Sequence, residues 1–286
     1  MEDKISSQLD ADVDALAAFM APHRHVLVLS GAGISTASGI PDYRDANGVR
    51  RGKAPMEGPA FRSSEAMRRR YWARSMIGWP KLAGTAPNAG HHALATLETA
   101  GKVSTILTQN VDGLHQQAGS SDVIELHGNI HRVVCLDCGT AHTRRSVQDL
   151  LEHANPELTA SDAATLPDGD ADLETAALAD FHVPPCPVCG GMLQPDVVFF
   201  GDGVPRVRSE AAERAVAAAD AVLVVGSSLV VFSGYRFCRM AAEAGKPIAA
   251  INRGVTRADP LLAIKSEEAA ELLLPLLADR LGSAQA

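Results

Sequence analysis

Two closely spaced cysteine pairs carry the clearest chemical signal in this sequence. Cys135 and Cys138 form one C-x-x-C pair, and Cys186 and Cys189 form a second. Four thiolates can surround Zn²⁺ tetrahedrally, and a closed set of four leaves no coordination position open for catalysis. The interval between the pairs is longer than in common zinc ribbons, so a redox pair and chance clustering are the alternatives. Glycines adjoin both pairs and favour a metal. We therefore predict one structural zinc.

A glycine-rich turn is the second signal. Residues 30–35 read Ser-Gly-Ala-Gly-Ile-Ser and directly follow a short apolar run. In such a turn, backbone N–H groups can approach a pyrophosphate at a helix N-terminus. Thr36 occupies the third glycine position of the strict dinucleotide fingerprint. In addition, no acidic residue ends a second strand about 20 residues further on, where hydride-transfer enzymes hold the ribose. The turn favours dinucleotide binding but not a dehydrogenase.

Polar or small residues follow three further apolar runs. Gln109, Asn110 and Asp112 offer amide and carboxylate groups after one run. Residues 226–228 offer small side chains after another, and residues 252–254 follow a third. One such cluster is usually an ordinary capped turn. Four clusters at the same edge of a parallel sheet indicate a ligand site, because ligands bind outside the carboxyl ends of the strands.

His127 stands directly after another apolar run and before a glycine. Imidazole is the natural general base near neutral pH, although a lone histidine is more often structural. The position of His127 between residues 109–112 and the first cysteine pair favours the catalytic interpretation. The sequence contains no G-x-S-x-G elbow, P-loop or H-E-x-x-H motif, so ordinary hydrolase and NTPase functions lack support.

The elements that must position these residues alternate along the chain. Apolar runs typical of buried parallel strands span residues 25–30, 103–108, 123–126, 221–225 and 247–251. Helical patterns span residues 12–20, 89–100 and 209–219. Strands that alternate with helices predict an α/β fold with a doubly wound, parallel, Rossmann-like sheet.

Two stretches interrupt this alternation, and we expect both to be insertions over one edge of the sheet. Residues 45–87 are basic and mostly helical in pattern. Residues 131–194 are bounded by the cysteine pairs and contain a Pro/Asp/Gly-rich loop around residues 167–172. We therefore predict a helical insertion at 45–87 and a zinc-binding module at 131–194. The Rossmann-like domain is then made of three parts: 1–44, 88–130 and 195–286.

Composition and charge exclude several classes of protein. The chain has 286 residues, of which 46% are apolar, enough for a large core. Its formal net charge of -8 argues against bulk attraction to nucleic acid. The acidic start lacks the pattern of a signal peptide, and the apolar runs are too short to cross a membrane. We expect a soluble, cytoplasmic protein that binds neither nucleic acid nor membranes, and we leave its oligomeric state open.

Taken together, these motifs resemble those of the sirtuin family of NAD-dependent protein deacylases. The matching segments keep the family's order and span nearly the whole chain: 31–44, 108–115, 125–128, 195–201, 225–229 and the four cysteines. Other segments resemble the class II branch, which includes mitochondrial sirtuin-4: 70–74, 78–80, 135–139, 167–170 and 227–237. Compact ends without a transit peptide suggest a bacterial member of that branch.

The resemblance implies NAD as co-substrate, one structural zinc and a set of NAD-binding residues. The implied NAD-binding residues are Gly31, Ala32, Gly33, Ser35, Ile40, Asp42, Tyr43, Arg44, Gln109, Asn110, Asp112, Gly226, Ser227, Ser228, Asn252, Arg253 and Gly254. Of these, residues 32–33 and 227–228 would face the phosphates and Asn252 the adenine ribose.

The nicotinamide end of NAD has its own implied pocket. Asn110 and Asp112 would hold this end, and Ile40 and Asp42 would complete the pocket. Arg44 would help to place the ribose and the phosphates.

The implied reaction transfers an acyl group from lysine to ADP-ribose. The acyl carbonyl oxygen attacks the ribose carbon as nicotinamide leaves, and His127 deprotonates a ribose hydroxyl that attacks the resulting amidate. His127 and Asn110 are the implied catalytic residues. The partner would be an acylated protein lysine whose peptide pairs as an extended strand between the backbone after Gly201 and that after Leu229.

Departures from the commoner family pattern leave the acyl group open. Tyr43, Ser227 and Asp202 replace Phe, Thr and Glu, and all three suit the class II branch, whose members are poor generic deacetylases. Tyr71 and Arg74 lie three apart and could read a substrate carboxylate, unless Arg74 is simply a surface arginine. Two alternative functions also stay open: mono-ADP-ribosyl transfer from the same pocket, and a non-catalytic NAD or ADP-ribose sensor.

Overall fold

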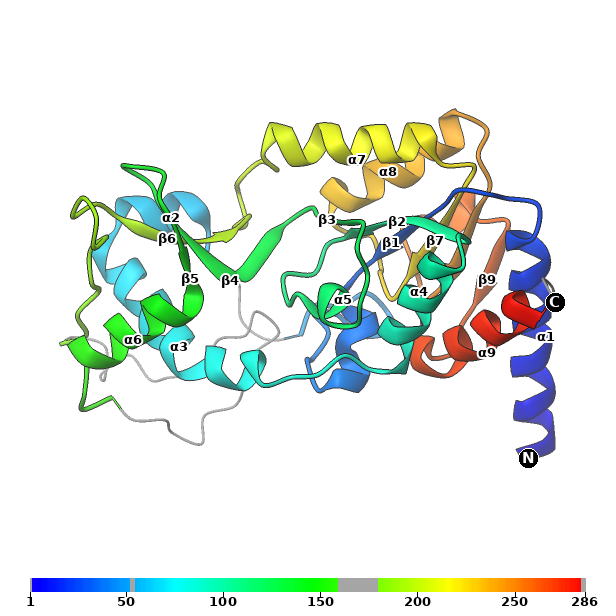
Figure 1. The fold of residues 1–286 in the computed structure, drawn as a ribbon, viewed down its shortest axis with the longest axis horizontal. Helices are drawn as coiled ribbons and strands as arrows, with labels where there is room; N and C mark the ends of the chain where they lie inside the picture. Colours follow the sequence, from blue (N-terminus) through cyan, green and yellow to red (C-terminus); the bar gives the residue numbers. More distant parts are fainter. Residues whose placement is uncertain (1, 52–54, 159–179, 284–286) are drawn as a thin grey trace.

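A computed structural model describes residues 2–51, 55–158 and 180–283. It has a larger lobe, built on a parallel sheet with helices on both faces, and a smaller lobe at one end of the first (Figure 1). The loop expected around residues 167–172, with the class II segment 167–170, lies outside the described residues. Within the described ranges, every helix is too short or too polar to cross a bilayer.

The larger lobe contains a six-stranded sheet of order β3-β2-β1-β7-β8-β9, in which all neighbouring strands are parallel. Its strands are β1 (Val26–Ser30), β2 (Val103–Thr108), β3 (Val123–Glu125), β7 (Ala221–Val225), β8 (Ile248–Ile251) and β9 (Ile264–Ser266). All residues of β1, β7 and β8 are buried, which explains their unbroken apolar runs. The predicted doubly wound α/β fold is confirmed, although the short edge strand β9 carries no apolar run and was not predicted.

Helices cover both faces of this sheet because alternate strand residues point to opposite sides. One face carries α1 (Glu2–Met20), α4 (Ala89–Thr99) and α9 (Ala270–Ser283), and the other carries α7 (Arg206–Ala218) and α8 (Phe232–Glu243). Val28 of β1 belongs to the core under the first set, whereas Leu27 and Leu29 belong to the core under the second. Both α1 and α7 begin earlier than their apolar periodicity indicated, since polar residues form their first turns.

The direction of winding reverses between β1 and β7. The chain passes from β1 to β2 and β3 on one side, while β7, β8 and β9 extend the sheet on the other. At such a point the connections diverge and leave a crevice outside the carboxyl ends of the strands. Residues 31–33 follow β1 and residues 226–228 follow β7, so two of the predicted ligand turns meet at this crevice.

The smaller lobe combines the two segments that were expected as separate insertions. Its antiparallel sheet has the order β5-β4-β6. Its elements are α2 (Gly58–Ser63), α3 (Glu65–Ala83), β4 (Gly128–Cys135), β5 (Ala141–Thr143), α6 (Arg144–Ala154) and β6 (Leu193–Val197). Residues from both segments share one apolar core, including Phe61 and Trp72 from the first and Val133 and Leu151 from the second.

A buried arginine holds α6 against α3 in this lobe. Arg144, the first residue of α6, is fully buried, and its guanidinium lies 5.4 Å from the Trp72 ring and 4.8 Å from the Trp79 ring. It also donates to the carbonyl oxygen of Ser75 at 3.2 Å. Cation–π contacts of this kind are strongest when the cation is desolvated. The two segments therefore pack together as a single lobe.

Candidate active site

A cavity of about 1120 Å³ opens where the two lobes meet at the carboxyl ends of β1, β2 and β7. Its lining includes His127 and every predicted NAD-binding residue except Gly254. Gly254 packs instead against the loop at Ala46: a Cβ at this position would lie 2.1 Å from the Ala46 carbonyl oxygen. The structure thus brings together residues that are up to about 220 positions apart in the sequence. This was predicted from their positions directly after parallel strands, whose carboxyl ends lie at one edge of the sheet.

The glycines of the turn after β1 allow this turn to pack closely against the end of β7. Gly31 N–H donates to the Val225 carbonyl at 3.0 Å, and Gly33 N–H donates to the Gly226 carbonyl at 2.8 Å. A Cβ on Gly33 would lie 2.8 Å from the Gly226 carbonyl oxygen. Protein carbonyls therefore already accept from the N–H groups of Gly31 and Gly33, two of the backbone groups in the turn that was predicted to approach a pyrophosphate. The turn also leads into a short 3₁₀ helix (Ala32–Ser38), not an α-helix.

Asn110, Ser35 and Asp112 form a directional hydrogen-bond network below this turn. Asn110 Nδ2 lies 3.1 Å from both Ser35 Oγ and the Gly31 carbonyl oxygen. Because a carbonyl can only accept, the amide nitrogen must face Gly31, and Oδ1 of Asn110 is left as an acceptor. Ser35 Oγ donates to Asp112 Oδ2 at 2.7 Å, and Asp112 Oδ1 accepts from Leu114 N–H at 3.0 Å. Burial raises the pKa of Asp112, while these two hydrogen bonds oppose the rise.

Two buried histidines support this network, and neither was predicted to have a role. His91 Nδ1 accepts from the Asn88 N–H at 3.3 Å, so the ring proton must sit on Nε2, which faces Ser35 Oγ at 3.5 Å. The His115 ring lies 5.0 Å from the His91 ring, and its Nε2 lies 2.8 Å from Ser30 Oγ. Burial lowers the pKa of His91 to about 4 and that of His115 to about 3. The signal available in the sequence was Asn88 followed three residues later by His91, a helix capping pattern.

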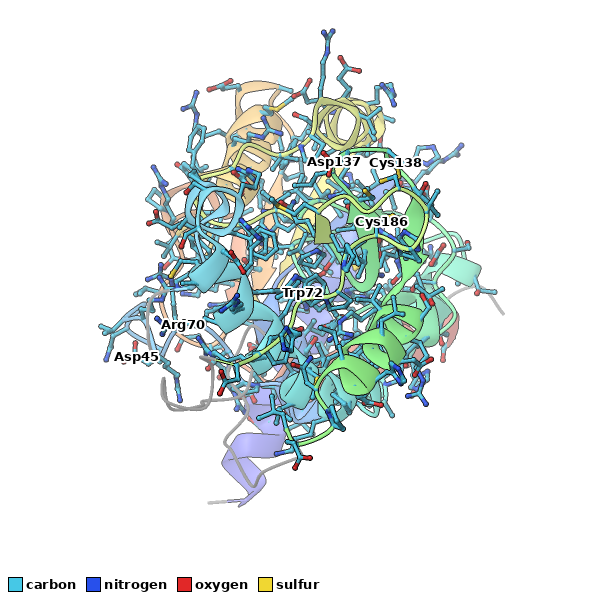
Figure 2. All side chains as sticks on the ribbon, turned by 90° about the vertical axis from the view of Figure 1, so that its left-hand side faces the viewer. Asp45, Arg70, Trp72, Asp137, Cys138 and Cys186 are labelled. Atoms are coloured by element: carbon cyan, nitrogen blue, oxygen red, sulfur yellow. The ribbon has the colours of Figure 1, made fainter. Side chains whose placement is uncertain are left out.

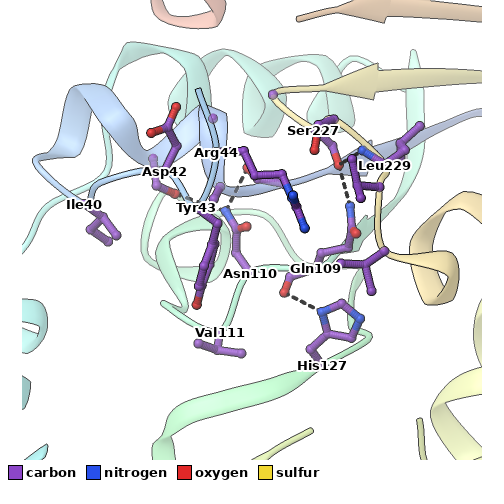
Figure 3. Close-up of a pocket in the computed structure, with 18 of the residues that line it drawn as sticks. Ile40, Asp42, Tyr43, Arg44, Gln109, Asn110, Val111, His127, Ser227 and Leu229 are labelled. Atoms are coloured by element: carbon purple, nitrogen blue, oxygen red, sulfur yellow. Dashed lines mark hydrogen bonds between the residues drawn. The ribbon is translucent and has the colours of Figure 1, made fainter. Parts of the chain in front are cut away.

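His127 has both ring nitrogens engaged. Nδ1 lies 3.0 Å from the backbone carbonyl oxygen of Gln109 (dashed in Figure 3), and Nε2 lies 2.8 Å from Ser233 Oγ. The Gln109 carbonyl requires a proton on Nδ1, so the neutral ring carries its lone pair on Nε2. Burial is the main cause that lowers the pKa of His127; the Gln109 hydrogen bond opposes it and the positive charge of Arg208 adds to it. The His127 ring is therefore neutral, and the lone pair of Nε2 faces Ser233 Oγ.

The loop after Pro41 is ordered by its own polar contacts. Asp42 pairs with Arg51 at 3.2 Å, and Arg44 Nη1 donates to the Gly48 carbonyl at 2.9 Å. In Figure 3 the Asp42 carboxylate points away from His127. Ile40, in contrast, packs in the apolar cluster that joins the lobes, with Trp79. Asp42 and Arg44 line the cavity while their charged groups are held by neighbouring residues of the loop.

The predicted acyl-reading pair is not brought together at the cavity. Tyr71 lines it and packs edge-on against Phe61 and Phe199. Arg74 is buried and is not among the described lining residues. Arg50 is one of several arginines in the lining, and its guanidinium lies 5.1 Å from the centre of the Phe200 ring. Sequence spacing missed Arg50 because this contact joins residues 150 positions apart.

The four paired cysteines converge in the smaller lobe, away from the cavity lining. Their sulfur atoms all lie within 4.8 Å of one another, with Cys135–Cys189 at 3.5 Å and Cys138–Cys186 at 3.9 Å. Tetrahedral zinc–thiolate bonds of about 2.3 Å require sulfur separations of about 3.8 Å, so the set fits Zn²⁺. Figure 2 shows Cys138 and Cys186 close together, apart from Trp72 in the interior of the lobe.

The backbone around the cysteines explains the glycines beside them. Gly139 N–H donates to the Cys135 carbonyl at 3.0 Å, and Gly190 N–H donates to the Cys186 carbonyl at 2.8 Å. Both glycines have positive φ angles, 72° and 77°, which other residues rarely adopt. Asp137 then joins the two turns, because its carboxylate accepts from Met192 N–H at 2.7 Å.

These features define a dinucleotide-binding α/β protein with a buried histidine in its cavity and a closed four-cysteine site. A model described as "Sir2 family" matches residues 31–233, and the chain belongs to this family. A protein of Xanthomonas axonopodis pv. citri named "NAD-dependent protein deacetylase" is 53% identical over 93% of this chain and 91% of its own length. "NAD-dependent protein deacetylase 2" of Bradyrhizobium diazoefficiens is 53% identical over 91% of this chain and 95% of its own.

Solved structures of the family share the fold. The structure described as "Structural Basis for the Mechanism and Regulation of Sir2 Enzymes" has a TM-score of 0.75 and 29% identity over 96% of this chain and 99% of its own. The structure "Sir2-p53 peptide-NAD+" has a TM-score of 0.73 and 28% identity over 95% of this chain and 97% of its own.

Proposed function

We propose that this chain is an NAD-dependent protein-lysine deacylase that transfers the acyl group to ADP-ribose and releases nicotinamide. The observation that carries the proposal is His127, a neutral ring with its lone pair on Nε2, in the same cavity as Asn110 and Asp112. Family membership and relatives named NAD-dependent protein deacetylases support it.

NAD, the co-substrate, would lie across the switch point of the sheet. Its phosphates would lie near residues 32–33 and 227–228, and the adenine ribose near Asn252. Its nicotinamide end would reach Asn110, whose Oδ1 is available as an acceptor, and Asp112. The remaining predicted NAD-binding residues that line the cavity would enclose it. Gly254 would act indirectly, by letting the loop at residue 46 come close.

His127 would act as the general base on a ribose hydroxyl. Its Nε2 lone pair takes the hydroxyl proton, and the ribose oxygen then attacks the carbon of the acyl group. A base of this kind contributes roughly 10²–10⁴-fold to the rate. The neutral ring is required for this step, and burial together with the charge of Arg208 favours the neutral form.

The acylated peptide would enter as an extended strand between two backbone segments. Phe200 and Gly201 lie on one side of the cavity, and Leu229 and Val230 lie on the other. Both segments turn sharply, with positive φ at Gly201 (80°) and at Leu229 (54°). Phe200 and Val230 are exposed apolar residues, which suits contact with a peptide. Strand addition of this kind uses backbone hydrogen bonds for affinity and side-chain pockets for specificity.

Zinc would stabilise the smaller lobe without taking part in the reaction. Cys135, Cys138, Cys186 and Cys189 would hold it as a closed tetrahedral set. Within the family, we place the chain in the class II, sirtuin-4-like branch, on residues 70–74, 78–80 and 227–237. In this view residues 131–194 form the zinc-binding module and residues 45–87 the helical insertion.

A panel of acyl peptides tests the proposal. The purified protein and NAD are mixed with one peptide that bears acetyl-, glutaryl-, methylglutaryl-, lipoyl- or long-chain acyl-lysine, and the products are measured by mass spectrometry. We expect NAD-dependent loss of at least one acyl group, and no loss with His127→Tyr. Nicotinamide release with transfer of ADP-ribose to protein, and no deacylation, would instead indicate mono-ADP-ribosyl transfer. NAD binding without nicotinamide release would indicate a sensor.

A further inference from the structure

His127, the proposed base, has an internal partner on α8. Ser233 Oγ lies 2.8 Å from His127 Nε2, although the two residues are 106 positions apart. Ser233 is the second residue of α8, and both side chains line the cavity. The contact therefore places a hydroxyl at the atom that must accept the substrate proton.

The direction of this hydrogen bond follows from the other side of the ring. Nδ1 faces the Gln109 carbonyl, which can only accept, so Nδ1 carries the proton of the neutral imidazole. Nε2 then has one lone pair and no proton, and the Ser233 hydroxyl must donate to it. The lone pair that the reaction needs is thus already engaged.

The close approach of α8 to the base is built into the chain. Gly234, next to Ser233, is buried, and a Cβ there would lie 2.4 Å from Oε1 of Gln109. Gln109 is the same residue whose carbonyl fixes Nδ1 of His127. The ring is therefore held between the end of β2 and the first turn of α8, and a larger residue at 234 would displace the Gln109 side chain.

We propose that Ser233 is a positioning residue for His127: its hydroxyl donates to Nε2 in the ligand-free enzyme and gives up this place to the ribose hydroxyl of the co-substrate. The inference rests on the proposed function, in which His127 is the general base. Before NAD binds, Ser233 keeps the ring neutral and aimed into the cavity. After NAD binds, the ribose hydroxyl occupies the same lone pair and can transfer its proton to Nε2.

The charges around the ring make a donor at Nε2 useful. Arg208, paired with Asp196, faces His127 from α7, and Arg236 of α8 lines the same cavity 3.9 Å from Glu213. A cationic ring would be repelled by Arg208. A hydroxyl that donates to the neutral ring opposes protonation further, because it bonds to the uncharged form.

Nuclear magnetic resonance of the histidine ring nitrogens tests the contact without any turnover. Signals of His127 are assigned by their loss in His127→Asn. In the wild type we expect a protonated Nδ1 and a hydrogen-bonded, unprotonated Nε2. Ser233→Ala should move the Nε2 signal to that of a free lone pair, and Ser233→Thr should restore it. Ser209→Ala is the matched control, since this hydroxyl contacts Arg236 of α8 but not His127. An Nε2 signal that is the same in wild type and Ser233→Ala would overturn the proposal.

The pH profiles of the two kinetic constants test the exchange. The acid limb of kcat/KM for NAD reports ionisations of the enzyme before NAD binds. The acid limb of kcat reports ionisations of the enzyme–substrate complex. With Ser233→Ala we expect the acid limb of kcat/KM to move to higher pH, because the neutral ring has lost its donor. The limb of kcat should stay in place, since the ribose hydroxyl fills the position in both proteins. Equal movement of both limbs, or of neither, would contradict the exchange. An inactive protein that still shows the expected ring signals would count against the deacylase proposal rather than the contact.

Discussion

The side-chain amide of Gln109 donates to the hydroxyl of Ser227 at 2.8 Å and so ties the end of β2 to the end of β7. The bond is drawn dashed in Figure 3. The backbone carbonyl of the same Gln109 accepts from Nδ1 of His127. One residue therefore couples the turn proposed for the phosphates to the proposed base.

Gln109→Ala should weaken activity by breaking this tie. A net hydrogen bond is worth about 1 kcal/mol, so we expect kcat/KM for the peptide to fall about fivefold to tenfold. The affinity for NAD, measured by calorimetry, should fall with it. Gln116→Ala is the matched control, because the Gln116 amide bonds Glu125 at an exposed site. Equal effects of the two variants would show that the Ser227 bond does not matter.

Asp112→Asn should raise stability at neutral pH while it lowers turnover. Burial raises the pKa of Asp112 above 3.8, so the folded chain binds this proton more tightly than the unfolded chain. The charged carboxylate therefore destabilises the fold increasingly as pH rises from 3.8 to the folded pKa. The melting temperature of the variant should exceed that of wild type by roughly 2–4 °C per kcal/mol gained. Calorimetric scans should show this difference shrinking toward pH 4, and a constant difference would refute its electrostatic origin.

Acid should destabilise the protein through His91 and His115. Their pKa values in the folded chain, about 4 and about 3, lie below the ordinary 6.5. Below pH 6.5 the unfolded chain therefore binds protons at these rings that the folded chain does not bind. Each ring should therefore lower the free energy of unfolding by up to about 1.4 kcal/mol per pH unit below 6.5.

Urea titrations at several pH values between 7 and 4 measure this slope. His91→Gln should be less stable at pH 7, because Ser35 and Asn88 lose a partner, but its stability should depend less on pH. His153→Gln, at an exposed site of α6, should leave the slope as it is. A His91→Gln slope that equals that of wild type would exclude His91 as a source.

Removal of zinc should unfold the smaller lobe. The four thiolates join residues about 50 positions apart, and a closed zinc site supplies folding free energy directly. The chain has two tryptophans, and both Trp72 and Trp79 lie on α3 of this lobe, so tryptophan fluorescence reports its unfolding specifically. Strong chelators, or Cys138→Ser, should lower the bound zinc below one ion per chain. The tryptophan emission should then shift to longer wavelength, because the smaller lobe unfolds. Cys238→Ser, in the core of the larger lobe, should keep its zinc.

Acyl selectivity should depend on Arg50 and not on Arg74. Arg50 lines the cavity beside Phe200, whereas Arg74 is buried outside the described lining. Arg50→Met should lower turnover of glutaryl-lysine relative to acetyl-lysine, because Arg suits a carboxylate partner. Arg74→Met should lower the melting temperature and leave this ratio unchanged. If the ratio of glutaryl-lysine to acetyl-lysine turnover changed only with Arg74→Met, the original prediction that Tyr71 and Arg74 bind a substrate carboxylate would hold instead.

The sequence by itself determined the fold class, and all but one of the predicted NAD-binding residues line the cavity. Strands buried on both faces are mostly apolar, so β1, β7 and β8 were visible as apolar runs. Parallel strands end at one edge, and therefore the polar residues after them had to meet. The cysteine pairs predicted a metal site because the C-x-x-C spacing by itself allows two thiolates to bind one zinc ion.

Only the tertiary structure decided which atoms of those residues face a ligand. Ser233 and His127 meet across 106 positions, and Arg50 and Phe200 across 150, because the folded lobes bring distant segments together. Backbone carbonyl groups at or just after the ends of other strands fix the proton on Nδ1 of His127, the amide orientation of Asn110 and the contacts of the Gly31 and Gly33 N–H groups. A backbone carbonyl is present at every residue, so no residue type in the sequence can signal which one will act as the partner.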